Sequence, residues 1–235
     1  MFKRALRVIP RRTVTFQTFN TPNPNALKFV AVDSAIVPLE NKSFEFTSSH
    51  DAIHSPLARQ LFKLEGVRSV MLGPDFLTVN KLDHVNWAHL RPEVVELVDT
   101  FLTQKKEPVV SRDLLEEGER EAAASEYDSE VVSMIKELLE TRIRPAIQDD
   151  GGDIEYRGFD EDTGTVFVKL QGACKSCGES EVTLRNGIES MLKHYIEEVH
   201  NVEQILDPEE EIALKEFERM EANLKKRKES PPPSL

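Results

Sequence analysis

A stretch of acidic and small residues near the middle of the chain constrains the fold more than any other feature. Residues 105–128 read KKEPVVSRDLLEEGEREAAASEYD, and apolar side chains become sparse after Leu115. A segment of this composition buries too little apolar surface to form a core of its own, so we interpret it as a linker with at most a transient helix. The sequence therefore predicts an α+β protein of two small mixed α/β domains, residues 15–104 and 129–207, joined by an acidic linker.

The first predicted domain mixes strand-like and helix-like patterns. Runs rich in β-branched and aromatic residues predict strands at residues 27–32, 43–47, 67–72 and 76–79,. The turn sequence Gly73-Pro74-Asp75 is expected to join the last two strands as a hairpin,. Helical spacing of apolar residues predicts two helices, one from Ser55-Pro56 to about Gly66 and the other over residues 87–102,.

The second predicted domain begins with an amphipathic helix over residues 129–148. Its apolar residues recur every three or four positions, and Pro145 is expected to kink it near its end,. Gly151 and Gly152 then stop the helix and turn the chain into a sheet, with direct contact to a bound group as the alternative role,. The elements expected after this turn are a β-hairpin, a helix and a short strand, at residues 153–159 and 165–171, 180–196, and 202–206,.

The chain has two cysteines, Cys174 and Cys177, which form a C-x-x-C motif. The motif follows a predicted strand and precedes a predicted helix, where unpaired backbone N–H groups and the helix dipole stabilise a thiolate. Gly172 and Gly178 frame the motif and let the loop fold closely around a bound group,. A disulfide between the two would close too short a loop to stabilise the fold. The second domain is thus predicted as helix, β-hairpin, C-x-x-C loop and helix, with the loop as a metal or redox site.

The number of available ligands favours a site shared between two chains. Structural zinc sites and [4Fe–4S] clusters both take four protein ligands, whereas one chain offers two thiolates. Two copies that meet across a twofold axis would supply four. Three alternatives stay open here: a structural zinc shared by two chains, a dithiol–disulfide oxidoreductase, and two ordinary core cysteines. A thioredoxin-like oxidoreductase would need a later proline facing the motif, and none lies between Cys177 and Pro208.

Charge is distributed unevenly along the chain. The net charge is −12 at pH 7, yet the N-terminal segment MFKRALRVIPRR carries only basic charges. This composition is typical of a mitochondrial presequence, which we expect over residues 1–14. The acidic remainder argues against nucleic acid as a partner, and the absence of a long apolar run argues against a membrane. We recognise no nucleophile–base pair, so we do not expect an enzyme; residues 208–235 read as a charged tail.

Long motifs resemble a known family. The segments EVVSMIKELLETRIRPAIQ, DDGGDIEYRGF and LQGACKSCGESEVTLRNGIESML resemble the Nfu-type (NifU C-terminal) iron–sulfur scaffold domain, and TPNPNALKF with GVRSVMLGPDFLTVNK resembles the N-terminal domain of mitochondrial Nfu proteins. The resemblance implies a scaffold or carrier of the mitochondrial matrix that holds a [4Fe–4S] cluster between two subunits on Cys174 and Cys177. The implied partners are a second copy of the chain in a homodimer or higher oligomer, other cluster-assembly factors, and apo iron–sulfur proteins such as lipoate synthase and aconitase-type enzymes.

One position departs from the pattern of that family. Its members usually have proline after the second cysteine, whereas Gly178 and Glu179 follow here. Glycine makes the loop more flexible, and a carboxylate close to an anionic cluster is electrostatically unfavourable. We therefore expect a cluster that is bound more loosely than in relatives with proline.

Overall fold

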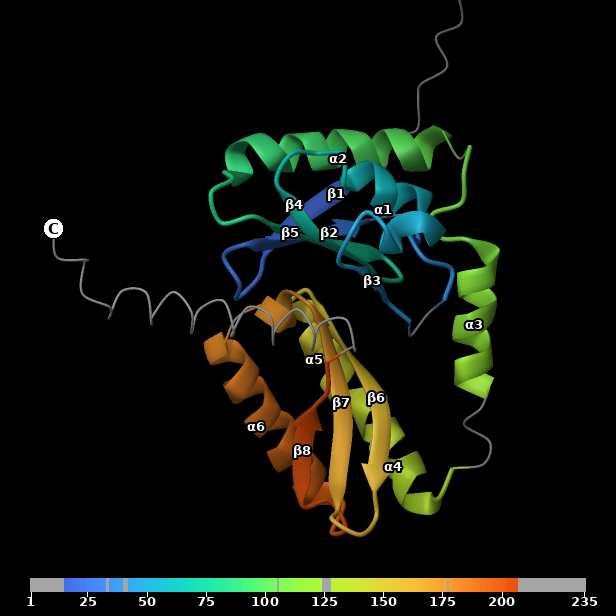
Figure 1. The fold of residues 1–235 in the computed structure, drawn as a ribbon, viewed down its shortest axis with the longest axis vertical. Coiled ribbons are helices and arrows are strands. Elements are labelled where there is room, and N and C mark those ends of the chain that lie inside the picture. Colours follow the sequence, from blue (N-terminus) through green and yellow to red (C-terminus); the bar gives the residue numbers. More distant parts are fainter. Residues whose placement is uncertain are drawn as a thin grey trace, which may run out of the picture.

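The computed structural model describes residues 15–206, except residues 33, 40–41, 105, 124–127 and 177. The predicted presequence and the predicted charged tail lie outside the described residues. The described part of the chain folds into two bodies of sheet and helix that pack against each other, which confirms the predicted α+β class (Figure 1). None of the helices within this part combines the length and the apolar character needed to cross a membrane.

The first body is a five-stranded antiparallel sheet with strand order β1-β2-β5-β4-β3 (Figure 1). Its strands are β1 (Phe16–Asn20), β2 (Ala26–Ala31), β3 (Phe44–Phe46), β4 (Val67–Leu72) and β5 (Phe76–Lys81). Its helices are the short 3-10 helix η1 (Asp51–His54), α1 (Pro56–Leu61) and α2 (Trp87–Gln104). The predicted strands and the hairpin between β4 and β5 are confirmed, whereas the sequence pattern does not predict the edge strand β1.

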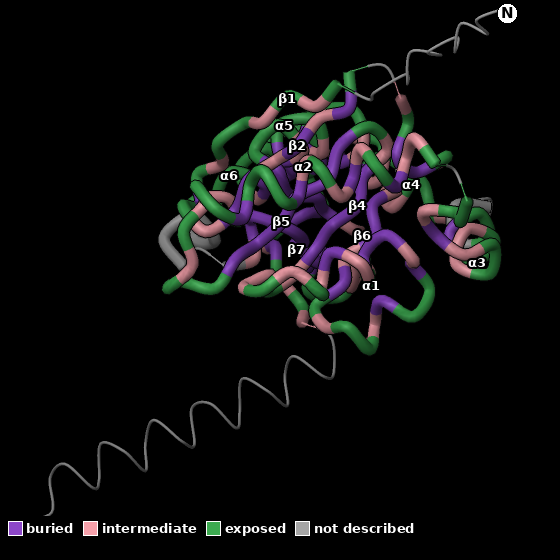
Figure 2. The backbone as a smooth tube through the Cα atoms, turned by 90° about the horizontal axis from the view of Figure 1, so that it is seen from above, coloured by how far each residue is buried: buried purple, intermediate pink, exposed green. Residues whose placement is uncertain are grey.

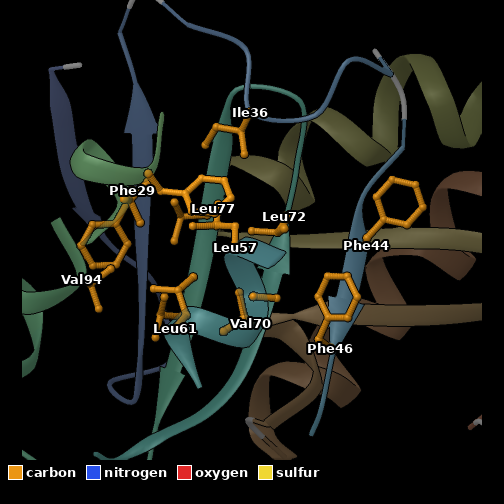
Figure 3. Packing of buried hydrophobic residues seen from close by; sticks show 14 of the residues in the cluster. Phe29, Ile36, Phe44, Phe46, Leu57, Leu61, Val70, Leu72, Leu77 and Val94 are labelled. Atoms are coloured by element: carbon orange, nitrogen blue, oxygen red, sulfur yellow. The ribbon is translucent and has the colours of Figure 1, made fainter. Parts of the chain in front are cut away.

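The core of the first body lies between the sheet and its helices. Leu57 and Leu61 of α1 and Val94 of α2 pack against strand residues such as Phe29 and Leu77 (Figure 3). All five side chains are buried, and each contributes about 1.5–3 kcal/mol relative to an exposed side chain,. The helices thus cover one face of the sheet and leave the other face for the second body.

Ser55 fixes both the start of α1 and the segment after α2. Its Oγ accepts a hydrogen bond from the N–H of Ala58 at 3.1 Å and donates one to the carbonyl of Val109 at 2.7 Å. Ser55 is buried, so alanine would remove the helix cap and leave the Val109 carbonyl without this donor,. We expect Ser55→Ala to lower the free energy of unfolding by about 2 kcal/mol in urea denaturation.

The control for this prediction is Ser129→Ala. Ser129 is exposed and caps only α4 (Glu130–Leu138), through a 3.4 Å bond from the N–H of Val132. Its loss should cost roughly 0.5 to 1 kcal/mol. Equal losses in the two variants would contradict the double role of Ser55.

The segment predicted as a linker contains helix α3 (Arg112–Ala123). The chain just before α3 is fastened to the first body, because Val110 is buried in its core and the N–H of Ser111 donates to the carbonyl of His54 at 2.7 Å. Leu114 and Leu115 pack against the same core. These apolar contacts give the helix a support that its acidic composition does not indicate, and the predicted domain boundaries stay a prediction.

The second body is a three-stranded sheet of order β6-β7-β8 with helices packed against it. Strands β6 (Gly152–Asp160) and β7 (Thr165–Gly172) form the predicted antiparallel hairpin, and β8 (Asn201–Gln204) pairs parallel to β7. Parallel neighbours need a crossover, which α6 (Gly178–Tyr195) provides,. Ile135 of α4, Val166 of β7 and Leu192 of α6 share one buried core.

The helix predicted over residues 129–148 is interrupted near Pro145. A π-helical turn, η3 (Leu139–Ile143), separates α4 from α5 (Arg144–Asp149). Proline lacks a backbone N–H and its ring crowds the carbonyl four residues earlier, so a wider turn at this place relieves the crowding. The interruption lies where the sequence predicts a kink, and Leu139 and Ile143, the first and last residues of the π-helical turn, are buried.

The second body packs against the open face of the first sheet. Strand β5 is buried along its whole length, and it lies with β7 in the buried centre of the molecule (Figure 2). Leu77 and Val79 belong to the core under the helices. Thr78 and Asn80, at alternate positions, make hydrogen bonds to the second body instead. Both faces of the central strand are therefore covered.

Candidate functional site

Cys174 lies in a short 3-10 helix, η4 (Ala173–Ser176), between β7 and α6. The residue is 9% exposed and belongs to the buried core of the second body. The structure thus places it at a junction of strand and helix. Cys177 lies outside the described residues, so its part in the site stays a prediction.

Gly152, the first residue of β6, leaves the space that the sulfur of Cys174 occupies. A Cβ atom at residue 152 would collide with Sγ of Cys174, and it would lie 3.0 Å from the carbonyl oxygen of Gln171. A side chain at residue 152 would therefore require the sulfur of Cys174 or its loop to shift,. Gly152 is thus fitted to the position of the sulfur, whereas the positive φ expected of the turn is found at Gly151, at +79°.

A cavity of about 360 Å³ opens beside Cys174, between the two bodies. The lining residues are Pro22, Asn23, Asp150, Ala173, Cys174, Thr183 and Leu184. They come from the turn after β1, the end of α5, the η4 loop and the first half of α6. Thiolates are the usual ligands of iron–sulfur clusters, so a cysteine at the wall of a cavity fits a cluster as the bound group.

Side chains of the first body bind the backbone next to Cys174. Three amide or hydroxyl groups donate hydrogen bonds to carbonyl oxygens there. The pairs are Asn23 to Ala173 at 3.3 Å, Thr78 to Gly151 at 2.8 Å and Asn80 to Gly172 at 3.5 Å. The Thr78 bond is short, and the Asn80 bond is long and weak. Together they hold the turn before β6 and the end of β7 against the first sheet.

Glu45 of β3 is the acidic partner of the loop. One of its carboxylate oxygens accepts a hydrogen bond from the N–H of Gly172 at 3.1 Å, and the other lies 3.1 Å from Nζ of Lys175. The Glu45 side chain is only 5% exposed, so water screens this ion pair weakly,. Lys175 stands between the two cysteines in the sequence, and the first body therefore holds the loop by a charge as well as by hydrogen bonds.

Lys28 of β2 is a second cation at the contact between the bodies. Its Nζ donates a hydrogen bond to the carbonyl of Gln148 at 2.8 Å. Burial lowers the pKa of Lys28, while the carboxylates of Asp149, Asp75 and Asp150 oppose this shift,. Asp149 and Asp150 thus stabilise a cation of the first body, a role that their position after a helix does not indicate.

Sequence patterns identify Cys174 but not the residues that surround it. The neighbours that they miss are Asn23, Lys28, Glu45, Thr78, Asn80 and the sulfur contact of Gly152. One signal was present in β5, where a threonine and an asparagine alternate with buried apolar residues and mark a polar second face. No comparable signal singles out Glu45.

Comparison with known proteins gives matches over most of the chain. Residues 16–105 match the family model "Scaffold protein Nfu/NifU N terminal", and residues 135–203 match "NifU-like domain". A NifU-like protein of Schizosaccharomyces pombe is 50% identical over 214 residues, which cover 91% of this chain and 81% of that protein. The mitochondrial NifU-like protein of Saccharomyces cerevisiae is 46% identical over 233 residues, covering 93% and 91%. The human mitochondrial "NFU1 iron-sulfur cluster scaffold homolog" is 48% identical over 201 residues, covering 85% and 75%.

These matches define the class of protein: the chain belongs to the NifU-like family of iron–sulfur cluster scaffold proteins. The resemblance on which the sequence prediction rested is confirmed. The predicted mitochondrial location is confirmed as well, since the relatives in yeast and human are named mitochondrial proteins. Between them, the two family models leave residues 106–134 unmatched, which is the region of α3.

Proposed function

We propose that this protein carries a [4Fe–4S] cluster between two copies of the chain and delivers it to apo iron–sulfur proteins of the mitochondrial matrix. The observation that carries the proposal is the position of Cys174, whose sulfur rests against Gly152 and lines a cavity. The scaffold names of the relatives support the nature of the cargo. Binding and release of a cluster need ligands and access, and no catalytic group.

The ligands proposed for the cluster are Cys174 and Cys177 of each chain. A [4Fe–4S] cluster takes four thiolates, and two chains related by a twofold axis supply that number. The N-terminus of α6 follows the motif directly, and its backbone N–H groups and dipole favour the charged form of nearby thiols,. A site that forms only when two chains meet also gives a route for release, because separation of the chains removes half of the ligands.

The proposed recipients are apo-proteins such as lipoate synthase and aconitase-type enzymes, and other cluster-assembly factors are proposed to act with the carrier. The net charge of −12 favours partners that present basic surfaces,. The same charge disfavours nucleic acid as a partner.

Anaerobic reconstitution with iron and sulfide tests the proposal. Mössbauer spectroscopy and size analysis of the same sample are expected to show a [4Fe–4S] cluster together with a dimer or higher oligomer. A monomer that takes up no iron but cycles a disulfide between Cys174 and Cys177 would refute the proposal and support an oxidoreductase. A zinc-filled dimer that excludes iron would support a structural metal instead.

Gly178 gives a prediction about how tightly the cluster is held. It is the first residue of α6, a position where proline fits because no backbone N–H is needed there,. We expect Gly178→Pro to slow iron loss to a chelator by roughly two- to fivefold. Proline restricts the free loop, so ordering the loop around the cluster costs about 0.4–1 kcal/mol less than with glycine. Gly178→Ala restricts the loop without fixing φ, so its rate of iron loss should fall between those of the wild type and Gly178→Pro. Equal rates of loss in all three proteins would rule out loop flexibility as the cause.

A further inference from the structure

We propose that the first body acts as a clamp on the η4 loop, which carries Cys174. Its polar sheet face binds this loop in the arrangement described above, called the closed chain, and must release the loop before two chains can share a cluster. The polar sheet face is defined by Lys28, Glu45, Thr78 and Asn80, on the side of the first sheet opposite α1 and α2, and it also carries the buried Met71. The proposal rests on the bridged carrier proposed above, since it concerns access to the same cysteines.

The placement of polar groups on this face is the first argument. An antiparallel sheet with helices on one side usually turns its polar residues toward water. Here Thr78 and Asn80 are 0% and 4% exposed, and both donate to carbonyl groups of the second body. Buried polar groups are costly unless they are paired. This face is therefore adapted to a polar ligand, and in the closed chain that ligand is the backbone next to Cys174.

The glycines of the second body complete the fit. A Cβ atom at Gly172 would lie 2.8 Å from Sδ of Met71, and one at Gly151 would lie 2.9 Å from Cγ2 of Thr21. Both glycines also have positive φ, at +69° and +79°. Their lack of side chains lets the backbone approach the first sheet closely enough for its carbonyls to be bound.

The ion pair between Glu45 and Lys175 is the charged link between the first body and the loop. Lys175 is adjacent to Cys174, and the side chains of Glu45 and Lys175 are 5% and 18% exposed. Removing one partner of a buried pair leaves an uncompensated charge, which destabilises the contact strongly. Glu45 is therefore the residue at which the clamp can be opened most selectively.

The closed arrangement of one chain conflicts with a cluster that is shared by two chains. Four thiolates around one cluster require the loops of two chains to come within a few ångströms of each other, by the length of metal–sulfur bonds of about 2.3 Å. In the closed chain, Asn23 of the first body lies against Ala173 and lines the same cavity as Cys174. The first body thus forms one wall of the cavity beside Cys174, and under the proposal this wall moves away so that the loop of a second chain can reach the same space.

Thiol accessibility in the iron-free, full-length chain tests the clamp. The rate of alkylation of Cys174 is measured by peptide mass spectrometry with N-ethylmaleimide and with a maleimide attached to a large polyethylene glycol. The ratio of the two rates reports steric access, because a change in thiolate fraction affects both reagents equally. We expect Glu45→Lys to raise the rate ratio of large to small reagent about tenfold, since it replaces an attraction by a repulsion. An unchanged ratio would overturn the proposal.

Two further variants make the result interpretable. Glu93→Lys makes the same charge change on an exposed position of α2, on the other face of the sheet, and should leave the ratio at its wild-type value. Thr78→Val removes only the hydrogen bond to Gly151 and adds no charge, so it should raise the ratio by a smaller factor of about three,. Thermal unfolding checks that each variant folds. If Thr78→Val and Glu45→Lys both behave like Glu93→Lys, the clamp does not exist.

A second measurement separates the clamp from the proposed function. Glu45→Lys is taken through anaerobic reconstitution and is expected to gain iron and sulfide faster than the wild type. Faster alkylation of Cys174 with an unchanged rate of iron and sulfide uptake would refute the claim that the clamp must release the loop before a cluster binds. Because alkylation needs no iron, its failure leaves the carrier proposal intact, and a failure of all variants to bind a cluster would count against the carrier proposal alone.

Discussion

Cys174→Ala is expected to abolish cluster binding and the dimer that depends on it. The substitution removes two of the four proposed ligands from a site shared by two chains, and two thiolates are too few to hold a [4Fe–4S] cluster. Iron and sulfide per chain after anaerobic reconstitution should fall to the background of protein without cysteine ligands. The fold should survive, because removing the SH group of this small, buried side chain costs only about 1 kcal/mol,.

Val202→Ala provides the control for this loss. Val202 lies on β8 and is fully buried in the same core as Cys174, but it is not part of the η4 loop. Its truncation should cost about 2 kcal/mol, more than the loss of the thiol, and yet leave cluster binding in place. If Cys174→Ala still binds a full complement of iron and sulfide, Cys174 is not a ligand. If both variants lose the cluster, the core and not the ligand is responsible.

Gly152→Ala is expected to impair both stability and cluster binding. The added methyl group would meet Sγ of Cys174 and the carbonyl oxygen of Gln171, so the hairpin or the η4 loop has to shift. Overpacking of this kind costs about 1–3 kcal/mol in the free energy of unfolding. Because the sulfur is displaced as well, cluster content after reconstitution should drop by at least half even where the variant is fully folded, as judged by urea denaturation and circular dichroism.

Gly187→Ala is the matched control. Gly187 lies within α6, and a Cβ atom there would meet nothing within 4 Å. Alanine should therefore raise the free energy of unfolding by roughly 0.5–1 kcal/mol, since glycine loses more conformational entropy in a helix. Cluster content should stay unchanged. A Gly152→Ala protein as stable as wild type, with full cluster content, would show that the sulfur does not need this space.

The apolar pattern was sufficient to predict most of the two sheets and their helices. Regular alternation and helical spacing report which side chains face a core, and the cores of both bodies are built from those positions,. Strand β1 escaped prediction because its five residues are mostly exposed and its pairing with β2 defines it. The π-helical turn at Leu139–Ile143 escaped as well, since hydrophobic spacing does not distinguish it from an α-helix.

The site was predictable only as far as it is local. The spacing of the motif and its place before a helix lead to Cys174 directly. The partners of the loop are remote in sequence: Glu45 and Lys175 are 130 positions apart, and Asn23 and Ala173 are 150 apart. Periodicity within one segment holds no information on such contacts. The close approach of Gly152 to a sulfur likewise depends on the pairing of β6 with β7.

The mixed contact between the two bodies also determines how their separation responds to temperature. It combines the hydrogen bonds and the ion pair of Thr78, Asn80 and Glu45 with the buried side chain of Met71, which meets Gly172. Exposure of apolar surface raises the heat capacity, whereas exposure of polar surface lowers it. The two contributions oppose each other when the bodies part, so parting should have a smaller heat-capacity change than unfolding of either core. The balance between closed and parted chains should therefore curve less with temperature than the stability of the cores.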